Sequence, residues 1–145
     1  MSITADNVNK KPIGIDMAIA KLLLLALVVI SAQGSDTQLC SVSDIQVQTV
    51  NARSRGSGPN GDTLFKVRVK NMCPCSVRNV RIDGRGFSST LDVDPSLFRA
   101  EGGGVYLVKG GRRIASMATV TFFYSWDHYF DLTPKSLEVE EDRCY

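Results

Sequence analysis

Four cysteines are the residues of this 145-residue chain whose type and spacing most directly indicate chemistry. Cys73 and Cys75 are separated only by Pro74, whereas Cys40 and Cys144 lie far away on either side. Four cysteines allow three disulfide connectivities. A Cys73–Cys75 bond would close a very small, strained ring, so we expect Cys40 and Cys144 each to bond one member of the close pair. The sequence leaves open which member each one takes.

A metal or redox site at the Cys-Pro-Cys step is the alternative use of these thiols. It is not favoured, because the sequence places no histidine or acidic ligand beside the pair. We therefore predict structural disulfides, each stabilising the fold by about 2 to 4 kcal/mol, with no metal and no cofactor.

Catalytic groups are sparse in this sequence. His128 is the only histidine, and no nucleophile elbow surrounds it, so a Ser-His-Asp or Cys-His site is not predicted. Asp92 and Asp94 could be imagined as paired glycosidase carboxylates. Acids that flank a turn at Pro95 are more often turn formers. We predict that the protein is not an enzyme.

The aromatic run around Trp126 offers a binding alternative. Tyr124, Trp126 and Tyr129 could form a platform on which sugar rings stack, which would make the chain a carbohydrate-binding or cell-wall-binding module. Burial of these rings in a core explains the same run more simply. The platform stays the main rival interpretation.

Short alternating strands must position all of these residues. In the run 64–70, Phe65, Val67 and Val69 alternate with Lys66, Arg68 and Lys70, which is typical of a half-buried strand. Further strands are expected at residues 45–50, 78–82, 87–93, 105–108, 117–124 and 136–140, with 126–132 continuing the strand at 117–124 after a turn. Residues 94–99 are expected to form a turn from which Leu97 and Phe98 point inward. This pattern predicts an all-β domain, a disulfide-stapled β-sandwich or jelly-roll-like fold.

The N-terminal residues have the character of a targeting segment. Lys10, Lys11 and Lys21 precede an uninterrupted apolar run at 22–30, and small residues follow it. We expect a signal peptide with an N-terminal extension at 1–34, which Met17 could also begin, and a secreted β domain at 35–145. The run is about half the length that a membrane-spanning helix needs, so an uncleaved anchor is less favoured. No stable membrane insertion is expected once the leader is removed.

An ordered set of motifs resembles the plant tapetum determinant family of small secreted cysteine-rich proteins. The motifs are Cys40-Ser41 with Asp44-Ile45, Asn71 before Cys73 and Cys75, Phe87-Ser88-Ser89, Pro95 with Phe98-Arg99, and Cys144-Tyr145. Together they cover residues 40–145. The family usually has two further cysteines, and here their places are Gly84 and the glycine run after Glu101. Loss of both together is expected if they were partners.

This resemblance implies a secreted signalling ligand for the ectodomain of a leucine-rich-repeat receptor kinase, acting in the apoplast on cell fate in the anther. The formal net charge of +2 is too small to indicate a nucleic-acid partner. A ligand needs a contact surface, and arginine is favoured at interfaces because its guanidinium pairs bidentately with carboxylates. The candidate receptor contacts are Arg53, Arg55, Lys66, Arg68, Lys70, Arg112 and Arg113. Ordinary solvation of these cations explains the same pattern equally well.

Overall fold

The computed structural model describes residues 39–53 and 58–145. The predicted leader and its cleavage point lie outside the described residues, and so does Arg55. Within the described part, no helix is both long enough and apolar enough to cross a membrane.

Strands make up the described domain, joined by turns and short 3₁₀ helices. The strands are β1 (Ile45–Asn51), β2 (Thr63–Asn71), β3 (Cys75–Asp83), β4 (Phe98–Gly102), β5 (Val105–Val108), β6 (Thr119–Trp126) and β7 (Thr133–Cys144). The 3₁₀ helices are η2 (Val42–Asp44), η3 (Pro59–Gly61) and η4 (Lys109–Gly111). The predicted all-β class is confirmed.

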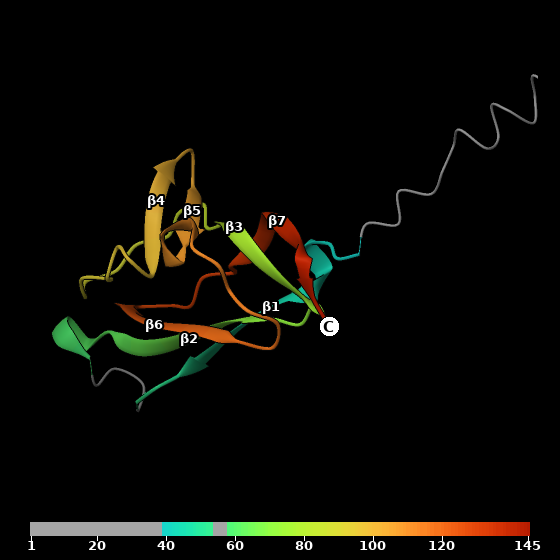
Figure 1. Ribbon diagram of the computed structural model, residues 1–145. Helices are drawn as coiled ribbons and strands as arrows, with labels where there is room; N and C mark the ends of the chain where they lie inside the picture. Colours follow the sequence, from blue (N-terminus) through green and yellow to red (C-terminus); the bar gives the residue numbers. More distant parts are fainter. Residues whose placement is uncertain (1–38, 54–57) are drawn as a thin grey trace, which may run out of the picture. The chain divides into compact units, whose positions relative to one another are not determined.

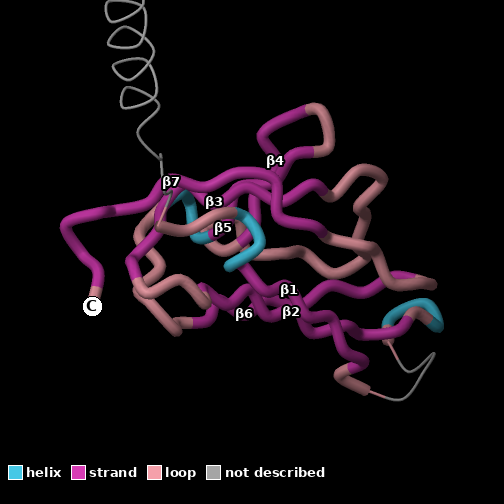
Figure 2. Tube along the Cα trace, turned by 90° about the vertical axis from the view of Figure 1, so that its right-hand side faces the viewer, coloured by secondary structure: helices cyan, strands magenta, loops and turns pink. Residues whose placement is uncertain are grey.

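Two antiparallel sheets lie face to face. One has the strand order β1-β2-β6 and the other the order β4-β5-β3-β7. Figures 1 and 2 show the two sheets as separate layers in both views. This is the sandwich-like arrangement that the strand spacing predicts.

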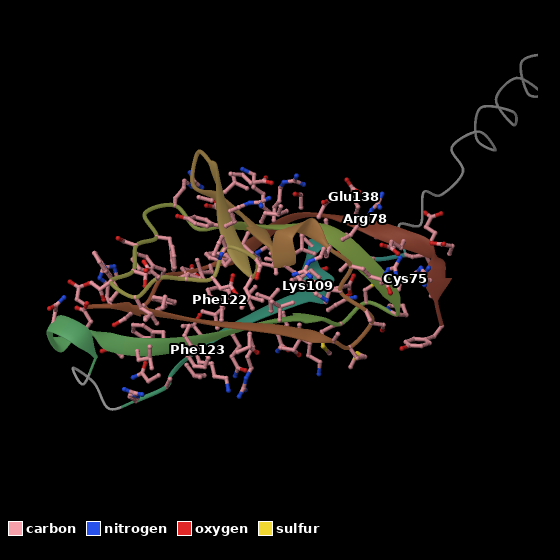
Figure 3. All side chains as sticks on the ribbon, turned by 60° about the vertical axis from the view of Figure 1, so that its left-hand side comes forward. Cys75, Arg78, Lys109, Phe122, Phe123 and Glu138 are labelled. Atoms are coloured by element: carbon pink, nitrogen blue, oxygen red, sulfur yellow. A yellow bond between two sulfur atoms is a disulfide. The ribbon has the colours of Figure 1, made fainter. Side chains whose placement is uncertain are left out.

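Strict alternation in β2 determines which side of the three-stranded sheet is buried. Phe65, Val67 and Val69 are buried, while Arg68 between them is exposed. The register places Val67 opposite Phe122 of β6, and Phe122 is buried as well. Figure 3 shows Phe122 between the layers and its neighbour Phe123 on the outer side.

An aromatic stack joins the two sheets. The ring of Phe98 in β4 lies 4.3 Å from the ring of Phe122 and 4.5 Å from the ring of Tyr106, measured between centroids. Offset or stacked aromatic pairs at these distances add to the stability that burial gives. The predicted inward position of Phe98 is confirmed, since only 3% of it is exposed.

Two predicted strands are wrong. The segment 87–93 has no strand, because Ser89 closes a local turn: its Oγ donates to Leu91 O (2.7 Å) and accepts from Leu91 N (3.1 Å). Of the predicted segment 126–132, only Trp126 lies in a strand, at the end of β6; the rest is irregular, since it carries the chain from β6 in one sheet to β7 in the other. Conversely, β4 forms where the sequence predicts only the end of a turn.

Candidate functional site

The cysteine corner fastens both ends of the described domain to the connection between β2 and β3. Cys40 is bonded to Cys73, and Cys75 is bonded to Cys144. This is one of the two arrangements that the sequence leaves open. The sulfurs of Cys40, Cys73 and Cys75 lie within 4.8 Å of one another because the two disulfides are adjacent.

Asn71 holds this corner in shape from inside. Its side chain is fully buried and donates to the carbonyl oxygens of Cys75 (2.9 Å) and Ile114 (3.0 Å). Its Oδ1 accepts from the backbone N–H of Cys73 at 3.0 Å. One side chain therefore bonds the Cys73 N–H and the Cys75 carbonyl of the corner and ties them to Ile114, whose carbonyl also accepts from Val77 N. The sequence shows Asn71 before the cysteine pair but gives no sign of this role.

The outer side of the three-stranded sheet carries three cations in a row along β2, namely Lys66, Arg68 and Lys70. The register places Lys66 between Val50 and Phe123, Arg68 between Gln48 and Thr121, and Lys70 between Gln46 and Thr119. We call these nine residues the basic face. It contains no acidic residue.

None of the three cations has an acidic partner among the described residues. Arg68 is exposed, and Lys66 and Lys70 are partly exposed. The ammonium of Lys66 lies 5.9 Å from the centroid of the Phe123 ring, within the range of a cation–π contact. The basic face therefore keeps its positive charge.

A shallow depression of about 470 Å³ lies on the basic face between Arg68 and Lys70. Its other lining residues are Gln46, Gln48, Thr119 and Thr121. Two cations with neutral amides and hydroxyls around them form a set of hydrogen-bond donors suited to an anionic group.

The outer side of the four-stranded sheet is different, because three arginines there are paired with glutamates. Ion pairs join Arg78 to Glu138 (3.2 Å), Arg81 to Glu101 (2.8 Å) and Arg113 to Glu140 (2.7 Å). Figure 3 shows Arg78 beside Glu138 on the side of this sheet that faces away from the other layer. Such exposed pairs stabilise little, but they neutralise the surface.

The predicted contact residues separate into two groups in the structure. Lys66, Arg68 and Lys70 belong to the basic face. Arg113 is paired with Glu140 beside the other sheet, and Arg112 donates to the backbone oxygen of Lys109 at 3.0 Å. Arg53 is exposed beyond the end of β1.

The residues considered for catalysis or sugar stacking have other surroundings. Asp94 accepts from the N–H and the Oγ of Ser96, and the hydrogen bond from the Ser96 N–H is the main reason that the pKa of Asp94 is lowered. Tyr124 is fully buried, and its hydroxyl accepts from Phe130 N at 2.9 Å. Tyr124 is therefore part of the core and cannot form a platform with Tyr129, which is 65% exposed.

Comparison with known proteins gives a family match. The family model described as "Tapetum determinant 1, C-terminal" matches residues 41–140. No solved structure gives a significant match.

Two plant proteins are similar in sequence. An uncharacterized protein of Arabidopsis thaliana is 39% identical over 75 residues, which is 50% of this chain and 58% of the relative. TPD1 protein homolog 1B of Oryza sativa subsp. japonica is 33% identical over 102 residues, which is 70% of this chain and 59% of the relative. This chain therefore spans less than two thirds of the length of either relative.

Proposed function

Because this chain belongs to the tapetum determinant 1 family, we propose that it is a secreted signalling ligand for the ectodomain of a leucine-rich-repeat receptor kinase in plant development. The family match over residues 41–140 is the observation that carries the proposal. It covers nearly all of the two-sheet domain and includes the cysteine corner except Cys40 and Cys144. The rice relative's name places that protein in the same family.

The two disulfides support an extracellular location. Structural disulfides persist in oxidising compartments and are rare in the cytosol. The predicted leader at 1–34 belongs to the same proposal, with secretion into the apoplast as its consequence. A role in cell fate in the anther is the specific form of signalling that the family resemblance implies.

The domain offers little that an enzyme would need. Asp94 is engaged in a turn, and the ring of His128 lies beside the exposed carboxylate of Asp127. By contrast, a ligand needs only a rigid surface that keeps its shape on binding. The cysteine corner and the aromatic stack supply that rigidity.

Direct binding tests the proposal. The full chain is expressed through a plant secretory pathway, and the protein recovered from the medium is measured against a panel of leucine-rich-repeat receptor kinase ectodomains by biolayer interferometry. We expect saturable binding to one or a few ectodomains. Retention of the protein in the cytosol with free thiols, or binding to no ectodomain, would contradict the proposal.

A further inference from the structure

We infer that the basic face is the docking surface, and that its occupant is an acidic protein surface with an apolar side chain at one end. This inference rests on the proposed function, since it takes the receptor ectodomain as the protein that supplies the acidic surface. It assigns the contact to the three-stranded sheet and removes Arg112 and Arg113 from the predicted contacts.

The basic face is open to a partner. No described element covers the outer side of the β1-β2-β6 sheet in either view of the fold. Val50 and Phe123 are 36% and 41% exposed there, on either side of Lys66. An exposed valine and phenylalanine beside cations suit a protein contact, in which apolar side chains are buried next to charged residues.

The positive charge of the basic face indicates that the occupant is acidic. Lys66, Arg68 and Lys70 have no acidic partner among the described residues, whereas Arg78, Arg81 and Arg113 beside the other sheet are each paired with a glutamate. A partner can therefore pair with these three cations without first breaking an existing ion pair. Alternate residues on a strand are about 7 Å apart, so the partner must present carboxylates at a similar spacing.

The depression between Arg68 and Lys70 indicates where a carboxylate inserts. Gln46, Gln48, Thr119 and Thr121 line it together with the two cations, so an entering carboxylate meets donors on several sides. The guanidinium of Arg68 can hold such a group bidentately. The row of Val50, Lys66 and Phe123 then receives the apolar side chain, where the partner also shields the contact between Lys66 and the Phe123 ring from water.

A polyuronate chain of the cell wall is a second source of carboxylates. It offers repeated charge, but its apolar surface is limited to the C–H faces of the sugar rings, so Val50 would contribute little to its binding and Phe123 only a stacking contact. The mixed composition of the basic face therefore favours a protein, and direct measurement against immobilised polygalacturonate distinguishes the two occupants.

The experiment compares the wild-type secreted chain with three variants, R68E/K70E, F123A and the control R99E. Arg99 is exposed on β4 in the other sheet and has no ion pair among the described residues, so R99E changes charge without touching the basic face. Each protein is measured against the ectodomain panel, immobilised polygalacturonate, and vesicles of phosphatidylcholine with phosphatidylserine. Circular dichroism verifies the fold of every variant.

We expect R68E/K70E to weaken ectodomain binding by about tenfold or more and F123A by a smaller factor, while R99E stays within about twofold of the wild type. If R68E/K70E binds the ectodomain as the wild type does, the docking surface is wrong although the proposed function stands. If the wild type binds only polygalacturonate or vesicles, a protein occupant is wrong. Binding to none of the three overturns both the inference and the proposed function.

Discussion

At the scale of single residues, Asn71 shows how one side chain can replace part of a sheet ladder. The chain leaves β2 at Asn71 and must reach β3 at Cys75 within a few residues, with Asn71, Cys73 and Cys75 buried. The amide of Asn71 has both donors and an acceptor in fixed positions, which match the two carbonyls and one N–H of the corner. No hydroxyl or carboxylate side chain offers this combination.

We predict that N71A lowers the free energy of unfolding by about 2 to 3 kcal/mol, because buried backbone groups lose their partners. The measurement is chemical denaturation followed by tryptophan fluorescence, with both disulfides intact. Q48A is the control, since Gln48 is an exposed amide on β1. Equal stability of N71A and Q48A would contradict the structural role of Asn71.

We expect the stability of the folded domain to depend on pH in the alkaline range because of Tyr124. Burial raises the pKa of the Tyr124 phenol above its ordinary value, against a lowering effect of the hydrogen bond from Phe130 N. The folded state therefore holds the phenol proton more tightly than the unfolded chain. This stabilisation is fully present below the unfolded pKa of about 10 and is lost as the pH rises through the folded pKa.

We expect Y124F to be less stable than the wild type at neutral pH by about 1 kcal/mol, because the Phe130 N–H loses its acceptor. As the pH rises above about 10, the difference in unfolding free energy between the two proteins should narrow, because only the wild type loses stability when this phenol ionises. Denaturation curves of both proteins at neutral and alkaline pH measure this. A difference that widens with pH would show that the assigned direction is wrong.

At the scale of elements, strands could be predicted where a period of two runs through apolar and charged residues. β2 shows this alternation, and β5 was predicted with its observed bounds at 105–108. The segment 87–93 has a strand-like composition but forms other hydrogen bonds. Ser89 Oγ donates to Leu91 O and accepts from Ser125 N, and Thr90 N donates to Ser125 O near the end of β6. β4 contains Arg99, Ala100, Glu101 and a glycine, which is not a composition typical of a strand. The strand forms because this segment pairs with β5.

The two places at which the resemblance to the family implies further cysteines, Gly84 and the glycine run after Glu101, are adjacent in space. The N–H of Gly84 donates to the carbonyl of Gly104 at 2.8 Å. A Cβ on Gly84 would lie 3.0 Å from the ring of Tyr106, so this ring occupies the space beside Gly84. Packing of Tyr106 beside Gly84 and the hydrogen bond from Gly84 to Gly104 join the two segments here.

We expect removal of each disulfide to loosen a different part of the domain. We expect C75A/C144A to lose about 2 to 4 kcal/mol of stability and to release the C-terminal end of β7, because that end is exposed and is held by this bond. Hydrogen exchange should rise first in β7 and should leave β2 and β6 protected.

The matched variant C40A/C73A should instead loosen η2 and the start of β1, where Cys40 enters the domain. Exchange followed by peptide mass spectrometry separates the two patterns. An identical pattern in both variants would mean that the corner unfolds as one unit.

At the scale of the whole domain, the candidate site could be predicted only in part. The sequence shows Lys66, Arg68 and Lys70 on one side of a strand, because strand periodicity is local. It cannot show that Arg113 is neutralised by Glu140, or Arg78 by Glu138 sixty residues away, since those pairs depend on the register between distant strands. The predicted contacts therefore included Arg113, whose charge the fold has already paired with Glu140.

This separation of unpaired from paired cations predicts how salt acts on the complex. Charges at a distance steer association, and mobile ions screen them over about 8 to 10 Å at physiological ionic strength. We expect the association rate constant with a bound ectodomain to fall about tenfold between roughly 0.05 and 0.5 M NaCl, with a smaller change in dissociation. R68E/K70E should lose most of this dependence, whereas R78E, which alters a paired cation on the other sheet, should keep it. Surface plasmon resonance at several salt concentrations measures both rates, and equal salt slopes for the two variants would show that charge on the basic face does not guide the encounter.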